Sequence, residues 1–449
     1  MSIDIALHLN TRVPVRLDAA KLGRHGAILA QSGSGKSFML GRLIEELLLK
    51  TKARLLILDP NSDFIRLPNP DTSAFSDPKL APWFFPGESA AQFGTAWKAC
   101  QVAVASNNNL EGARGIKIDW GGLSEYEMAS VMKLDLSSES DLYWCLFLAS
   151  EIAKETWDDE DEVYDFDHFR EQSDTVVNYL LTNRGPKLLR ENPLAQTLRA
   201  TLNKQVTLRF RALVSSLADF SIWRSTGDGE RDICTWVTNP ESEHRALVVD
   251  LQSLSNEDER IAVTTRILST IWDRARKDLW EATRDFDKDD LRVPLFIVVD
   301  EAHNLIPAVK DDPGIERLCA QMVRIAAEGR KFGLHLLVAT QRPRKIDSNV
   351  LSECDNLFLM KMTNDSDVKY ACELFGFLTN AMGAQAKQLH VGEMLLAGSV
   401  FTTSEAIHSA PRRTIQGGKG ISEQYWAVPY GTSEELSVPQ AKRVRCKSR

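Results

Sequence analysis

The segment 30–37, with the sequence AQSGSGKS, most constrains what this chain can fold into. It follows a short apolar run at 27–29 and precedes a helical pattern over 38–50. The order of strand, glycine-rich turn and helix predicts a phosphate-binding P-loop. Backbone N–H groups and the helix N-terminus of such a loop surround anionic oxygens. The residues expected to contact a nucleotide are Ser32, Gly33, Ser34, Gly35, Lys36, Ser37 and Phe38.

Two P-loop side chains have predicted roles. Lys36 is expected to reach the β- and γ-phosphates of ATP, and Ser37 is expected to hold Mg²⁺. Ala30 stands where such motifs usually carry their first glycine, which is a small change in volume. The alternative interpretation is an ordinary turn rich in glycine and serine.

A second motif supplies carboxylates. The apolar run 295–299 ends in Asp300 and Glu301, which is typical of a Walker B strand. Asp300 is expected in the Mg²⁺ shell, and Glu301 is expected to polarise the attacking water. The sequence DEAH at 300–303 also occurs in superfamily 2 helicases, but too little chain follows for their second motor lobe. His303 is therefore expected to start a helix or to support its neighbours.

Two further polar residues are candidates. Gln341 follows the apolar run 334–340 and is interpreted as a γ-phosphate sensor, with a polar turn closed by Pro343 as the alternative. Arg330 lies at the end of a helical pattern, where a cation is favourable. It is also a candidate arginine finger for a nucleotide bound by a neighbouring subunit, with Arg324 in reserve.

Alternating strand and helix patterns predict an α/β fold with a doubly wound, mostly parallel sheet. The expected parallel strands are 26–30, 54–59, 246–251, 295–300, 334–340, 356–361 and 394–400. We expect four parts: a first core segment at 1–67, an inserted and mainly helical subdomain at 68–242, a second core segment at 243–405, and a C-terminal extension at 406–449. The extension ends in a basic tail, interpreted either as a disordered end or as a contact with nucleic acid or a neighbouring subunit.

Composition limits the partners. The net charge of −8 argues against a globally basic nucleic-acid coat but permits a locally basic pore. The seven cysteines are scattered without a C-x-x-C pair, which indicates no zinc site or disulfide framework and fits a cytoplasmic protein. The longest apolar stretch, at 142–153, is too short to span a bilayer, so no membrane partner is expected.

Taken in order, these motifs resemble the HerA/FtsK division of P-loop ATPases, and HerA-like proteins in particular. The matching segments lie in about half of the chain, at 22–37, 57–64, 299–305, 328–333, 341–343 and 392–396. The resemblance implies a RecA-like (additional-strand P-loop) core that assembles as a homo-hexamer and drives duplex DNA through its channel. It also implies a separate nuclease or NADase-type effector, with antiphage defence or DNA end processing as roles.

The resemblance also assigns residues. Lys36 and Ser37 bind nucleotide and Mg²⁺, while Asp300 and Glu301 form the Walker B pair. Gln341 is the sensor and Arg330 the finger in trans. Arg24 matches an arginine that lies near the phosphates in the family, and a surface role is the alternative.

Two other functions stay open at this stage. One is a secretion or conjugation ATPase of the same division. The other is an ATP-binding scaffold that regulates a partner enzyme. Stimulation of ATP turnover by duplex DNA would favour the motor, and activation by a partner without a DNA effect would favour the scaffold.

Overall fold

The computed structural model describes residues 2–159, 162–226, 231–238, 244–284, 290, 292–400, 403 and 405–417. The predicted basic tail lies outside the described residues.

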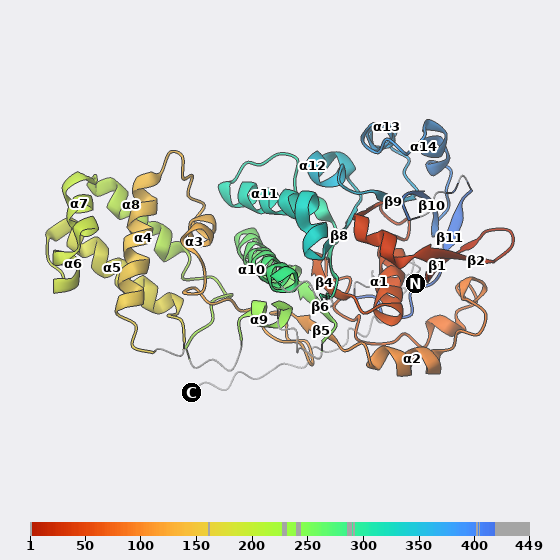
Figure 1. Ribbon diagram of the computed structural model, residues 1–449, viewed down its shortest axis with the longest axis horizontal. Coiled ribbons are helices and arrows are strands. Elements are labelled where there is room, and N and C mark those ends of the chain that lie inside the picture. Colours follow the sequence, from red (N-terminus) through yellow and green to blue (C-terminus); the bar gives the residue numbers. More distant parts are fainter. Residues whose placement is uncertain are drawn as a thin grey trace, which may run out of the picture. The chain divides into compact units, whose positions relative to one another are not determined.

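One sheet of eleven strands organises the described chain (Figure 1). In chain order the strands are β1 (Ser2–His8), β2 (Pro14–Asp18), β3 (Gly26–Leu29), β4 (Arg54–Asp59), β5 (Val102–Ala105), β6 (Ala246–Asp250), β7 (Leu295–Val299), β8 (Leu334–Thr340), β9 (Asn356–Met360), β10 (Glu393–Gly398) and β11 (Ile407–Ser409). Across the sheet their order is β2-β1-β11-β10-β9-β3-β8-β7-β4-β6-β5.

The strands from β9 to β5 in this order are parallel, which was predicted for all of them except β5. The P-loop strand β3 pairs with β8, and β8 pairs with the Walker B strand β7. An additional strand thus separates the two nucleotide motifs, which confirms the predicted RecA-like core. Because carboxyl ends of parallel strands meet at one edge, this order brings Lys36, Asp300 and Gln341 to the same place.

Helices cover both faces of the sheet and leave two apolar cores. Along β3, Ile28 packs into the core that contains α1 (Lys36–Lys50) and α2 (Ala90–Lys98), whereas Ala27 and Leu29 pack into the other. The second core contains α10 (Glu257–Arg284) and α11 (Pro313–Glu328). A strand buried on both faces reads as a continuous apolar run, which is why these strands were recognisable.

The region between β5 and β6 is mainly helical, as predicted. It contains α3 (Glu125–Val131), α4 (Ser140–Glu155), α5 (Phe166–Thr182), α6 (Lys187–Glu191), α7 (Pro193–Thr201), α8 (Lys204–Ser216) and α9 (Ile233–Thr238). Helices α4, α5 and α8 pack on one another; they are the gold to yellow-green helices labelled in Figure 1. α7 and α8 are separate helices, because Asn203 caps α8 with its side chain. The boundaries of the four expected parts stay predictions; β5 shows that the sheet takes one strand from within 68–242.

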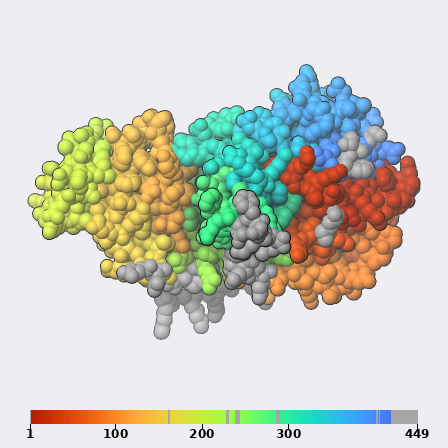
Figure 2. Space-filling model, in the orientation of Figure 1, coloured from red at the N-terminus to blue at the C-terminus, as the bar shows by residue number. Residues whose placement is uncertain are grey.

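One expectation about the sheet was wrong, and several strands were not foreseen. The strand expected at 394–400 is not parallel, because β10 runs antiparallel to β9. The sheet also continues into strands that were not expected: β11 pairs with β10, and the β1–β2 hairpin pairs with β11. An apolar run predicts a buried strand but not the direction of that strand. Strands β1 and β2 contain both polar and apolar residues, so no apolar run marks them. Figure 2 shows the N-terminal segment, in red, against the last described residues, in blue.

Shorter elements complete the fold. They are α12 (Ser348–Leu351), α13 (Asp365–Leu374), α14 (Asn380–Ala386) and the 3₁₀ helices at Ala19–Arg24, Ala74–Ser76, Ala81–Trp83, Leu251–Ser253, Ala302–Asn304, Gly329–Phe332 and Pro343–Lys345. Within the described part of the chain, no helix combines the length and apolar character needed to cross a membrane.

Candidate active site

The P-loop turns between β3 and α1 on two glycines with left-handed backbone. Gly33 has φ 74° and Gly35 has φ 98°, values that other residues adopt only with strain. Ser34 closes the turn, since its backbone N–H and its hydroxyl both donate to Gln31 O, at 3.2 and 2.7 Å. The loop is open to solvent on one side, where Ser32, Gly33 and Phe38 are exposed.

Lys36 lies between the two Walker B carboxylates. Its ammonium is paired with Asp300 Oδ1 and lies 3.1 Å from Glu301 Oε1. All three side chains are at least nine-tenths buried. Burial lowers the pKa of Lys36, but attraction to Asp300 and Glu301 outweighs it, so the pKa stays raised above its ordinary value. The Lys36 ammonium therefore stays charged, as binding to phosphate oxygens requires. Its partner Asp300 lies 264 residues further along the chain.

Glu301 is held in an unusual position. Its backbone is left-handed, with φ 41° and ψ 50°, which is a strained conformation for a residue with a Cβ atom. Gln341, at the end of β8, donates from Nε2 to Glu301 Oε1 at 2.5 Å. His303 Nδ1 lies 3.3 Å from Glu301 Oε2 and 3.2 Å from Thr340 Oγ1. Gln341 thus fixes the carboxylate through Oε1, whereas His303 lies beside Oε2, which has no hydrogen-bond partner among the described residues.

Ser37 has a partner that the sequence reasoning did not assign. Its hydroxyl donates to Asp63 Oδ2 at 2.8 Å. Asp63 follows β4, and its backbone N–H donates to Asp59 Oδ1 at 3.1 Å. Burial raises the pKa of Asp59 to about 7, against the hydrogen bonds from Phe64 and Asp63. The sequence did contain a clue to this contact, since Asp59 and Asp63 lie in the segment 57–64 that carries the family resemblance.

The residues present fit a magnesium ion. Asp300 Oδ2 is buried and has no hydrogen-bond partner among the described residues, which leaves a lone pair for a cation. The Ser37 hydroxyl supplies a second oxygen, the ligand type that Mg²⁺ prefers. In the described residues no cluster of three or more histidine, cysteine or acidic side chains forms a metal site made by protein alone. Magnesium that is shared with phosphate needs only one or two protein ligands.

Arg330 and Arg24 lie at the other edge of the sheet. Arg330 Nη2 is 3.2 Å from Asp355 Oδ2, and Arg24 Nη1 is 3.8 Å from the same oxygen. Arg330 precedes β8 and Gln341 follows it, so the seven residues of this strand, about 23 Å in length, separate the two side chains. Neither arginine reaches the P-loop of its own chain. The role of Arg330 as a finger in trans and the place of Arg24 near the phosphates stay predictions.

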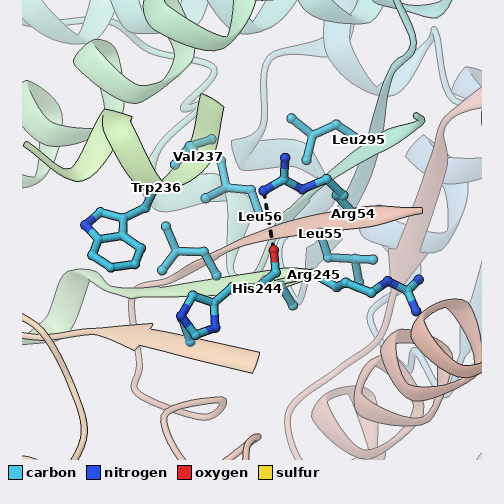
Figure 3. A pocket seen from close by; sticks show the side chains of 11 residues that line it. Arg54, Leu55, Leu56, Trp236, Val237, His244, Arg245 and Leu295 are labelled. Carbon is cyan, nitrogen blue, oxygen red and sulfur yellow. Dashed lines mark hydrogen bonds between the residues drawn. The ribbon is translucent and has the colours of Figure 1, made fainter. Parts of the chain in front are cut away.

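A small cavity elsewhere is unrelated to this site. It lies at the amino ends of β4 and β6, where Arg54 donates to His244 O at 3.3 Å (Figure 3). Trp236 lines it, and Leu55, Leu56 and Leu295 contribute apolar surface. The P-loop is at the opposite, carboxyl edge of the sheet.

An open P-loop, an additional strand and a buried carboxylate pair facing the lysine define a P-loop ATPase of the RecA-like class. The chain belongs to the HerA family: the family model "Helicase HerA, central domain" matches residues 4–271.

Named relatives agree with this assignment. A "Probable helicase" of Methanocaldococcus jannaschii is 24% identical over 437 residues, which cover 96% of this chain and 72% of the relative. The "DNA double-strand break repair helicase HerA" of Sulfolobus acidocaldarius is 27% identical over 392 residues, covering 87% of this chain and 65% of the relative. Among solved structures, VirB4 of Thermoanaerobacter pseudethanolicus is similar with a TM-score of 0.53 and 17% identity, covering 91% of this chain and 96% of VirB4, which shows a shared fold.

Proposed function

We propose that this chain is the ATP-hydrolysing subunit of a homo-hexameric ring that moves duplex DNA and works with a separate nuclease or NADase-type effector. The observation that carries the proposal is the division of the site between two sheet edges. Lys36 and its carboxylates lie at one edge, and Arg330 lies at the other. A site that needs both is complete only where two subunits meet. The names of the HerA relatives suggest DNA as the substrate, and the family resemblance suggests the effector.

In the proposed reaction, Lys36 exchanges its carboxylate partners for the oxygens of the β- and γ-phosphates. Glu301 then accepts a proton from the attacking water, and Gln341 fixes the orientation of that carboxylate through the bond to Oε1. Ser37 and Asp300 would hold Mg²⁺, which would neutralise charge that develops on the phosphates. Arg330 of the adjacent subunit stabilises the γ-phosphate from the open side.

A mixing experiment tests the shared site. Arg330→Ala subunits keep their own Glu301, and Glu301→Gln subunits keep their own Arg330. A mixed ring therefore contains some interfaces with both groups intact. We expect each variant alone to be inactive in ATP turnover and the mixture to regain part of the activity.

Two further measurements complete the design. Lys331→Ala is the matched control, because Lys331 neighbours Arg330 and is 63% exposed. Turnover is then measured with and without duplex DNA, and a rise is expected. Absence of recovery in the mixture would refute the shared site, and turnover indifferent to DNA would refute the motor.

A further inference from the structure

A stack of three flat side chains lies beside the P-loop. The Trp83 and His408 rings are parallel within 10°, with centroids 3.5 Å apart. The Arg12 guanidinium carbon lies over the Trp83 ring, 3.3 Å from its centroid. The three residues come from the β1–β2 turn, from the 3₁₀ helix Ala81–Trp83 and from β11. None of them belongs to a motif that the site described above uses.

The stack is joined to the phosphate loop through a glycine. Gly392 N donates to Ser34 O at 2.9 Å, so the start of β10 lies directly on the P-loop turn. A Cβ atom placed on Gly392 would come within 2.7 Å of His408 Nε2. Two contacts therefore lead from Ser34 to the imidazole, and one more leads to the indole. Trp83 is thus three contacts from Ser34 of the P-loop, and in a nucleotide a single sugar joins the base to the phosphates.

The chemistry of the stack suits a planar ligand. Trp83 is partly exposed, and the loop that carries it is fixed by Phe84 stacked on Phe75 with centroids 4.5 Å apart. Arg12 is exposed, and within the described residues it pairs with no carboxylate, so its guanidinium can leave the indole without breaking an ion pair. Aromatic faces bind nucleobases by stacking, without needing a particular base edge.

We propose that the face of Trp83 covered by Arg12 is the binding surface for the purine base of the nucleotide. His408 stacks on the other face of the indole and fixes its orientation, and Arg12 moves away from the indole when the base binds. This inference rests on the proposed ATP site and adds the base-binding subsite to it.

The test compares two ligands on two proteins by calorimetry in the presence of Mg²⁺. ATPγS carries a base, whereas inorganic tripolyphosphate carries phosphates alone. Trp83→Ala is expected to weaken ATPγS binding about tenfold to a hundredfold, the range for a base stacked on an aromatic ring, and to leave tripolyphosphate binding unchanged. Trp83→Phe keeps a ring and should retain most of the affinity. Trp280→Ala, at a tryptophan of α10 that is 70% exposed, is the matched control.

Each outcome decides the matter. Equal weakening of both ligands would mean that Trp83 only supports the P-loop, and no weakening would mean that it does not touch the base; either overturns the proposal. Failure of wild-type protein to bind tripolyphosphate would instead refute the phosphate site. A measurement on wild-type protein avoids any folding defect: photolabelling with 8-azido-ATP should mark the peptides of Arg12, Trp83 or His408. Labelling found only elsewhere would also overturn the proposal.

Discussion

Replacing Arg413 with methionine should destabilise the protein strongly, because Arg413 neutralises buried carboxylates behind the P-loop helix. Its guanidinium donates to Glu45 Oε2 at 3.0 Å, to Glu46 Oε1 at 2.7 Å and to Glu88 Oε1 at 2.8 Å. Glu45 and Glu46 lie on α1 and are at most 1% exposed. Arg42 also pairs with Glu46 and Glu88, at 3.2 and 2.6 Å. Arg413 is therefore the one cation of the described residues that pairs with Glu45.

The size of the stability loss depends on which carboxylates keep a cation. Glu46 and Glu88 keep Arg42, whereas Glu45 loses the one cation of the described residues that pairs with it. Removing one partner of a buried ion pair costs about 3–5 kcal/mol, because the other charge stays buried and uncompensated. Glu45 Oε1 keeps hydrogen bonds from Thr414 N and Thr414 Oγ1, both at 2.9 Å. We therefore expect Arg413→Met to lower the free energy of unfolding by about 3 kcal/mol, the lower end of that range.

Equilibrium unfolding in urea measures the effect, and a double-mutant cycle assigns it. Glu45→Gln together with Arg413→Met should lose clearly less than the sum of the two single losses, since no charge is then left unpaired. Lys187→Met is the control, because its pair with Glu191 is exposed on both sides and should contribute within about 0.5 kcal/mol. A loss below about 1 kcal/mol for Arg413→Met, the value of a surface pair, would refute the reasoning.

Three further predictions concern the site and its supports. Glu301→Gln should bind ATP but lower the turnover rate about 10²–10⁴-fold, the usual contribution of a general base; near-normal turnover would remove Glu301 from that role. Gly41→Ala should lower the free energy of unfolding by about 1–3 kcal/mol, because its Cβ would lie 2.5 Å from Cδ of the buried Arg412; an unchanged urea midpoint would show that the contact relaxes. Burial chiefly, with Arg330 and His335, lowers the pKa of His25 from 6.5 to about 3, so only the unfolded chain binds the proton between these values. This histidine should therefore cost about 1.4 kcal/mol of stability for each pH unit below 6.5, and His25→Gln should flatten the profile; parallel profiles for the two proteins would contradict this.

Much of the core was predictable from the sequence, because its strands are buried on both faces. The run at 54–59 became β4 and that at 334–340 became β8 without a change of bounds. The closeness of Lys36 to Asp300 followed from two motifs whose strands end at the same edge.

What could not be predicted depends on contacts between distant segments. The β1–β2 hairpin joins the sheet through its pairing with β11, and β10 runs antiparallel to β9. The pattern of polar and apolar residues within one segment predicts neither the position of the hairpin nor the direction of β10. The hydrogen bond from Ser37 to Asp63 depends on the path that the chain takes after β4. Arg413 reaches α1 across 368 residues, and its sequence neighbourhood contains no helix or strand pattern.

The central claim is that Lys36 and the Walker B carboxylates form an ATP-hydrolysing site. Its most direct test is the steady-state turnover of ATP by wild-type protein, Lys36→Ala and Lys50→Ala. Lys50 ends the same helix at an exposed position and serves as the control. We expect hydrolysis by the wild type and the Lys50 variant, and none above background by the Lys36 variant. Wild-type turnover in Lys36→Ala would contradict it.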